Sequence, residues 1–199
     1  MEALFYKSNP WWEEPFVLNA IQRDVYLNEL EGYIDNKDII FLTGLRRVGK
    51  TTLLKGIVNL LLHVKKIEPK HIFYISLDLY ALEGLSIADI VTEYRKLHKL
   101  PNSQMIYLFF DEVTSKKSYQ QELKNLYDLG GVKIFASASS ASLLKDSQAF
   151  LTGRQRLIEV LPLSFEEYLQ FKKIVIKKAD VHLVESYFEE YMKDGGMPE

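Results

Sequence analysis

The chain is 199 residues long, which suits one domain of ordinary size, and its hydrophobic content of 47% excludes an intrinsically disordered chain. Its formal net charge of −2 lacks the Lys/Arg excess with which nucleic-acid-binding proteins neutralise phosphates, so the overall charge gives no support for that class. The sequence contains no cysteine, which excludes disulfides, thiol catalysis and cysteine zinc sites.

Membrane and export signals are also missing from the sequence. No apolar stretch approaches the roughly 20 residues that a membrane-spanning helix needs. The first residues form neither the basic nor the apolar region of a signal peptide. We therefore expect a cytoplasmic protein that does not associate with a membrane.

Apolar runs of strand length alternate with segments of helical periodicity along the chain. After an N-terminal helical and aromatic segment at residues 1–36, with a helix opening at residues 21–23, we expect the core at residues 37–172. The predicted strands are residues 39–42, 71–77, 105–110, 132–137 and 157–161. The predicted helices are residues 50–64, 86–98, 119–129, 164–171 and a last helix from residue 184 to 192, within a C-terminal segment at residues 173–199.

This alternation predicts an α/β fold of three layers, in which a parallel five-stranded sheet is flanked by helices on both faces. In such sheets, ligands bind beyond the carboxyl ends of the strands. Polar residues follow three of the predicted strands at this edge, after Leu42, Phe110 and Phe135. We therefore expect the functional site there.

The first of these segments matches the phosphate-binding pattern G-x-x-x-x-G-K-[ST] in full, with a predicted strand before it and a helix after it. The glycines allow successive N–H groups to surround an anion, and the helix start adds its positive dipole end. We expect Lys50 to bind the β- and γ-phosphates and Thr51 to offer its hydroxyl to Mg²⁺. The predicted nucleotide contacts are Gly44, Leu45, Arg46, Arg47, Val48, Gly49, Lys50, Thr51 and Thr52.

Two parts of this hypothesis keep alternatives open. Side chains in the middle of such loops usually project away from the phosphates, so Arg46 and Arg47 are as well explained as solvated or partner-facing groups. Trp11 and Trp12 lie upstream, in a segment that could pass near the adenine. Aromatic rings packed against the edge of the core are the more common outcome.

The second segment is an apolar strand that ends in Asp111 and Glu112. Asp111 is placed to hold the hydration shell of Mg²⁺, and Glu112 can orient or deprotonate an attacking water. This adjacent glutamate favours an ATPase over a small-molecule kinase, which activates the hydroxyl of its substrate instead. A GTPase would carry Asn-Lys-x-Asp after the later strands, and the similar string at residues 36–38 precedes the phosphate loop.

Together these motifs resemble archaeal and bacterial P-loop ATPases of the AAA superfamily, the group related to STAND ATPases. The family pattern combines a Gly-x-Arg-Arg-x-Gly-Lys-Thr loop, an Asp-Glu strand end, a Thr-Gly-Ser strand end, Gly-Arg, and Leu-Pro-Leu-Ser-Phe-x-Glu. The corresponding residues are Gly44 to Thr51, Leu108 to Glu112, Ser137-Ala138-Ser139, Gly153-Arg154 and Leu161-Pro162-Leu163-Ser164-Phe165-Glu166-Glu167-Tyr168. The resemblance spans roughly residues 10–199.

The resemblance implies binding and hydrolysis of ATP in an ASCE-type, RecA-like core. It makes Thr51 and Asp111 the Mg²⁺ residues and Glu112 the catalytic base. Ser137 or Ser139 would contact the γ-phosphate or the attacking water, although both serines could instead cap the turn into residues 141–144. Arg154 would be a γ-phosphate arginine acting in cis or across a subunit contact, or else an arginine paired at the start of a strand.

Relatives that resemble this chain usually continue past Gly-Gly-x-Pro-Glu, so we expect a further C-terminal module after Glu199. An unknown protein or DNA partner would bind through that module, and the sequence does not predict the oligomeric state. Two other functions stay open: a slow nucleotide-dependent switch, as in STAND-like relatives, and a phosphotransferase. Glu112 argues against the phosphotransferase and only mildly against the switch.

Overall fold

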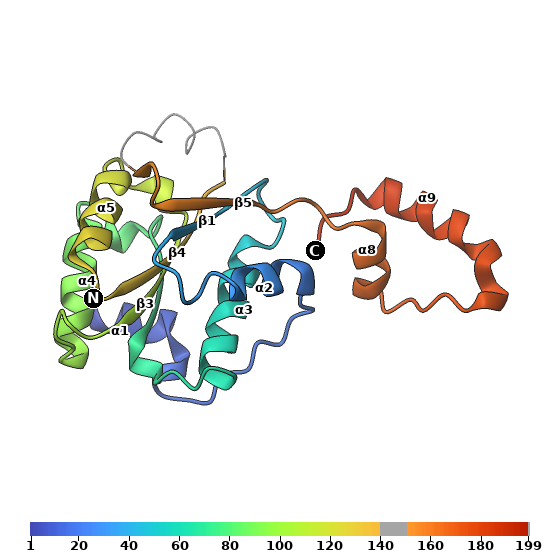
Figure 1. The fold of residues 1–199 in the computed structure, drawn as a ribbon. Helices are drawn as coiled ribbons and strands as arrows, with labels where there is room; N and C mark the ends of the chain where they lie inside the picture. Colours follow the sequence, from blue (N-terminus) through green and yellow to red (C-terminus); the bar gives the residue numbers. More distant parts are fainter. Residues whose placement is uncertain (140–150, 199) are drawn as a thin grey trace.

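The computed structural model describes residues 1–139 and 151–198 (Figure 1). A parallel sheet of five strands forms its centre, in the order β2-β3-β4-β1-β5. The strands are β1 (Ile39–Thr43), β2 (Ile72–Ser76), β3 (Ile106–Asp111), β4 (Val132–Ser137) and β5 (Gln155–Glu159). The prediction of a three-layer α/β fold with a parallel five-stranded sheet is confirmed.

The helices lie mainly around this sheet. They are α1 (Glu2–Ser8), α2 (Asp24–Glu31), α3 (Lys50–His63), α4 (Ile87–His98), α5 (Tyr119–Leu129), α8 (Phe165–Phe171) and α9 (Val184–Asp194). Short 3₁₀ turns occur at Pro10–Trp12, Pro69–His71, Tyr80–Leu82, Val113–Ser115 and Lys178–Leu183. In Figure 1, α8 and α9 extend away from the sheet as an arm. Among residues 1–139 and 151–198, no helix combines the length and the apolar character that crossing a membrane requires.

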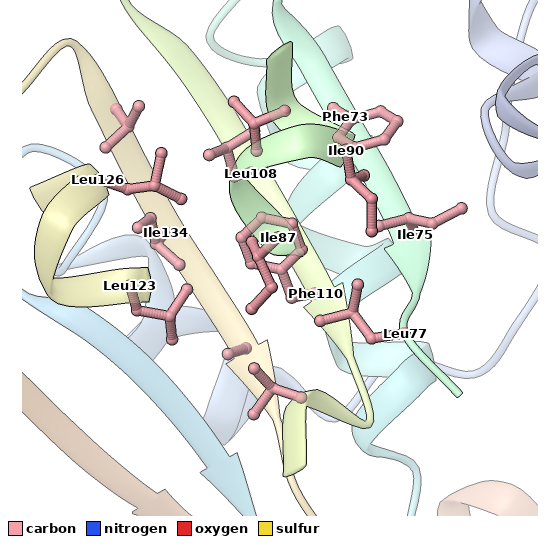
Figure 2. Packing of buried hydrophobic residues seen from close by; sticks show 14 of the residues in the cluster. Phe73, Ile75, Leu77, Ile87, Ile90, Leu108, Phe110, Leu123, Leu126 and Ile134 are labelled. Atoms are coloured by element: carbon pink, nitrogen blue, oxygen red, sulfur yellow. The ribbon is translucent and has the colours of Figure 1, made fainter. Parts of the chain in front are cut away.

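The alternation of side chains along the strands divides the core into two layers. On β3, Leu108 and Phe110 belong to one buried cluster, whereas Phe109 between them belongs to the other. The first cluster packs under α4 and α5, and the second packs under α2 and α3. Figure 2 shows the first layer, where Phe73, Ile75, Leu108, Phe110 and Ile134 of the strands meet Ile87, Ile90, Leu123 and Leu126 of the helices. Because both faces are covered, the central strands β1 and β3 are almost continuous apolar runs.

The fifth strand differs from its prediction by two residues, because β5 spans Gln155–Glu159 rather than residues 157–161. It is an edge strand, so only Ile158 of its five residues is buried, and its sequence lacks the continuous apolar run of the central strands. Buried Val160 directly follows the strand, and the apolar residues between Leu157 and Leu161 therefore predicted a strand that starts and ends two residues later.

The N-terminal residues cover the opposite edge of the sheet, where β2 would otherwise expose unpaired backbone groups. Asn9 is fully buried; its Nδ2 donates to the carbonyl of Tyr74 (2.9 Å), and its Oδ1 accepts from the N–H of Tyr74 (2.6 Å). The indole N–H groups of Trp11 and Trp12 both donate to the carbonyl of Ile72. The aromatic rings thus pack at the edge of the core, and helix α1 just before them was not predicted.

Lys133 is a fully buried lysine on the central strand β4. Its Nζ donates to the carbonyls of Asn36 and Asp38 and to the side-chain oxygen of Asn36, at 2.6 to 3.0 Å. These bonds hold the loop that leads into β1. Burial lowers the pKa of Lys133 to about 8, although the carboxylates of Asp38 and Asp35 oppose the shift.

This shift predicts a pH dependence of stability. Between pH 8 and 10.5 the unfolded chain, in which Lys133 keeps its ordinary pKa, binds more protons than the folded chain, so the free energy of unfolding rises with pH. We expect the wild type to gain roughly 1–3 kcal/mol across this range relative to Lys133→Met. Urea unfolding at several pH values measures this difference. The exposed Lys117→Met is the control, and an equal pH slope in wild type and Lys133→Met would refute the assignment.

Candidate nucleotide site

The loop between β1 and α3 has the backbone that its glycines predict. Gly44 and Gly49 have φ values of 138° and 98°, which residues with a Cβ atom rarely adopt. A Cβ atom on Gly44 would lie 2.3 Å from the carbonyl oxygen of Val160, so the loop passes directly against the chain that follows β5. Arg47 also has a positive φ, of 68°. The loop therefore keeps a curved conformation before α3 begins at Lys50.

Lys50 lies across this loop. Its side chain is largely buried, and its Nζ donates to the carbonyls of Gly44 (3.1 Å) and Leu45 (2.7 Å). Burial lowers its pKa, while the carboxylates of Glu112 and Asp111 act in the opposite direction. A cation held above the loop by two backbone carbonyls is well placed for an anion bound there.

Asp111 lies at the carboxyl end of β3 and accepts hydrogen bonds from three hydroxyl groups. Thr51 Oγ1 and Tyr74 OH donate to its Oδ2 at 2.6 and 2.8 Å, and Ser137 Oγ donates to its Oδ1. These donors come from α3, β2 and β4. The carboxylate is buried, so the three bonds fix its plane.

Glu112 turns the chain out of the sheet, with a left-handed φ of 49°. Its N–H donates to Ser137 Oγ at 3.0 Å, and its carboxylate accepts from Ser139 Oγ at 2.6 and 2.8 Å. Glu112 lines the cavity, whereas Asp111 does not belong to its lining. Two adjacent acids therefore occupy different environments.

A cavity of about 1400 Å³ lies over the phosphate loop. Its polar lining includes Lys50, Thr51, Glu112 and Ser139. The apolar part of its lining comes from the segment before and within α2, from α8 and from the C-terminal residues, namely Leu18, Ile21, Leu27, Phe171, Met197 and Pro198. The cavity thus combines a cationic, hydroxyl-rich floor with apolar side chains.

The predicted loop residues take different positions around this cavity. Arg46, Arg47, Gly49 and Thr52 line it. Leu45 projects into solvent, and the side chain of Val48 is fully buried in the core. Leu45 and Val48 can therefore offer backbone groups only, because neither side chain faces the cavity.

The two serines after β4 also separate. Ser139 lines the cavity beside Glu112, whereas Ser137 is fully buried behind Asp111 and lies outside the cavity lining. In this structure the hydroxyl of Ser137 donates to Asp111, so Ser139 is the better placed of the two serines, and a nucleotide contact by either stays a prediction. The alternative of a cap on residues 141–144 falls outside the described residues.

Arg154 is not part of this site. It precedes β5, and its carbonyl accepts from the N–H of Ile39 at the first residue of β1, so it lies at the amino ends of the parallel strands. Its guanidinium pairs with Asp128 at 3.3 Å and lies over the ring of Tyr127. A γ-phosphate contact in cis is therefore wrong, because the phosphate loop lies at the carboxyl ends of the strands and Arg154 at their amino ends. Action across a subunit contact stays a prediction.

Arg23 is a site residue that sequence reasoning missed. This buried guanidinium lines the cavity and donates to the carbonyl of Val48 in the loop at 3.2 Å. It also donates to the carbonyl of Leu161 and makes a bidentate pair with Glu167 of α8 at 2.7 and 2.8 Å. Burial opposes ionisation of Glu167, but its bonds from Arg23 and Ser164 lower its pKa overall. No spacing pattern marks Arg23, because its partners are distant in sequence.

The chain can be placed in a family by comparison. A family model described as an AAA domain matches residues 36–169. The chain belongs to this AAA family. The predicted membership of the AAA superfamily is confirmed, and a closer relation to STAND ATPases stays a prediction. Membership supports nucleotide binding and ATPase activity in general terms.

Uncharacterized proteins from two other organisms match most of this chain. Uncharacterized protein MJ1637 of Methanocaldococcus jannaschii is 32% identical over 178 residues, which cover 87% of this chain and 35% of that protein. An uncharacterized protein of Haemophilus influenzae is 30% identical over 182 residues, covering 89% and 44%. The chain thus spans less than half the length of either relative.

Two solved structures share the fold. The S. cerevisiae Hsp104-ADP complex aligns with a TM-score of 0.61 and 18% identity, covering 98% of this chain and 31% of that chain. C. elegans PCH-2 aligns with a TM-score of 0.53 and 18% identity, covering 78% and 47%. At such identities the likeness concerns the AAA-type α/β architecture alone.

The close approach of Gly44 to Val160 predicts the effect of a single methyl group. We expect Gly44→Ala to destabilise the fold by more than about 2 kcal/mol, because the new Cβ meets a carbonyl and the backbone must keep a positive φ. Gly84→Ala is the matched control, since Gly84 also has a positive φ but open space around it. Its expected cost is about 1 kcal/mol. Equal midpoints of chemical denaturation for the two variants would contradict the contact.

Proposed function

We propose that this AAA domain binds Mg-ATP in the cavity over the phosphate loop and hydrolyses it. The observation that carries the proposal is the Thr51–Asp111 contact, which joins the phosphate loop to the acidic end of β3 at 2.6 Å. It brings a phosphate-binding segment, a hydroxyl and a carboxylate to one point, where Glu112 also faces the cavity.

The residues present suit the nucleotide. Lys50 and the N–H groups of the loop provide positive charge for phosphates, and the apolar residues Ile21, Leu27 and Phe171 suit a purine base. ATP is favoured over GTP because the guanine-binding string is missing from the expected position in the sequence. The Hsp104 structure is a complex with ADP, which is consistent with an adenine nucleotide here.

The residues also suit magnesium. Mg²⁺ prefers hard oxygen ligands, and Thr51 and Asp111 offer a hydroxyl and a carboxylate. When bound, the ion neutralises charge on the phosphates. Glu112 then orients or deprotonates the attacking water, and Ser139, whose hydroxyl donates to Glu112, holds that carboxylate in place.

Coupling to conformational change belongs to the same proposal. Arg23 bonds the phosphate loop at Val48 and the first turn of α8 at Glu167, and α8 and α9 form the arm that extends from the sheet (Figure 1). A shift of the loop on nucleotide binding would therefore move α8 and α9. The longer relatives contain segments that this chain does not span. A protein or DNA partner that responds to this movement would bind such a segment.

A slow nucleotide-dependent switch is the alternative, and one observation favours it. Both oxygens of the Glu112 carboxylate lie within hydrogen-bonding distance of Ser139, so the base rests in a satisfied position. If this bond persists with ATP bound, activation of water would be slow.

Turnover by two variants tests the hydrolase. We expect Glu112→Gln to bind ATP normally but to lower turnover by about 100-fold or more, because the amide cannot accept the proton. Lys50→Ala should weaken ATP binding by about tenfold or more, because it loses a charge-assisted contact. Phosphate release and binding of a fluorescent ATP analogue measure the two effects.

The half-exposed Glu93→Gln on α4, which lies outside the cavity lining, is the matched control and should resemble wild type. Equal turnover by wild type and Glu112→Gln would reject the base assignment. Very slow turnover by both, with tight ATP binding, would favour the switch. A preference for GTP over ATP would reject the nucleotide assignment.

A further inference from the structure

Tyr74 supplies a contact to the site that none of the sequence motifs contains. Its hydroxyl reaches from β2 and donates to Asp111 Oδ2 at 2.8 Å, the same oxygen that accepts from Thr51. The ring is buried on the α3 side of the sheet.

We propose that Tyr74 is a positioning residue that orients the Asp111 carboxylate for magnesium, and that Asn9 fixes Tyr74 from the edge of the sheet. This inference rests on the proposed function, because it assigns Asp111 to the metal. Tyr74 itself acts only through Asp111.

The arrangement of donors around Asp111 supports this role. Ser137 holds Oδ1, whereas Thr51 and Tyr74 share Oδ2. Thr51 Oγ1 would also contact the metal, so the hydrogen bond from Thr51 to Asp111 would change when the metal binds. Tyr74 is the donor to Oδ2 that is anchored in the sheet and independent of the metal. Without it, Ser137 on Oδ1 is the one of these three donors that would still hold the carboxylate independently of the metal.

Asn9 fixes the position of the Tyr74 backbone. β2 is an edge strand, paired on one side with β3 through the register Tyr74↔Phe109. On its other side, the buried amide of Asn9 makes both backbone bonds of Tyr74, as a neighbouring strand would. The same amide donates to the carbonyl of Phe5 in α1. The N-terminal segment therefore locks the backbone from which the Tyr74 ring extends.

Magnesium titration of Tyr74→Phe tests the proposal. The protein is treated with a chelator, mixed with a fluorescent, non-hydrolysable ATP analogue, and titrated with Mg²⁺. We expect the concentration of Mg²⁺ for half-maximal effect to rise about 3- to 10-fold, less than the full effect of a hydrogen bond to a charged group, because Ser137 and Thr51 still donate to the carboxylate. Binding of the analogue in chelator should equal that of the wild type, because Lys50 and the loop are unchanged.

Tyr94→Phe is the matched control. It removes another buried hydroxyl, which donates to the carbonyl of Lys70 at 2.6 Å and lies outside the cavity lining. A merely structural role for Tyr74 predicts that both variants melt at lower temperature with the Mg²⁺ requirement of the wild type, and this result would overturn the inference. Asn9→Ala should shift the Mg²⁺ requirement in the same direction as Tyr74→Phe. A lower melting temperature without this shift would overturn the part assigned to Asn9.

The outcomes also separate this inference from the proposed function. Mg²⁺-dependent binding by the wild type together with an unshifted Tyr74→Phe refutes the role of Tyr74 alone. Binding by the wild type that is indifferent to Mg²⁺ refutes the metal assignment of Asp111 and, with it, the inference.

Discussion

The carboxylate of Asp111 accepts hydrogen bonds from three hydroxyls that the chain delivers from α3, β2 and β4. Each donor element is separated from β3 by a long connection, so nothing local holds them together. The bonds become possible because parallel strands present their carboxyl ends at one edge, where α3 also begins. A buried carboxylate left without donors is costly, so the folded state strongly favours this convergence. The phosphate loop and the acidic strand end thereby keep a fixed separation.

Hydrogen bonds near both ends of the described chain support this arrangement around Asp111. At the N-terminus, Asn9 and the two tryptophans complete the hydrogen bonding of β2, the strand that carries Tyr74. After β5, the chain is tied to the loop by Arg23, which binds Val48 and Glu167 together. The first arrangement favours rigidity, since Asn9 is fully buried. The second joins the loop to the arm of α8 and α9 that projects from the sheet (Figure 1).

The fold was largely predictable because its signals are local. Central strands such as β3 are continuous apolar runs, and the phosphate loop is a contiguous motif whose glycines satisfy specific backbone needs. Asp111 and Glu112 were found because they follow such a strand directly. The edge strand β5 was misplaced by two residues, since one buried residue in five leaves little pattern. Helix α1 buries only Phe5 and therefore shows little periodicity.

The residues that sequence reasoning missed or misplaced share a different cause. Arg154 was assigned from a family pattern, yet a residue that precedes a parallel strand must lie at the amino edge of the sheet, away from the phosphate loop. Strand direction alone therefore excluded its cis role. Arg23 and Tyr74 reach the site through partners between 25 and 144 residues away. An arginine before a helix and a tyrosine in a strand are ordinary in sequence, and only the register of β2 against β3 brings the hydroxyl of Tyr74 to Asp111.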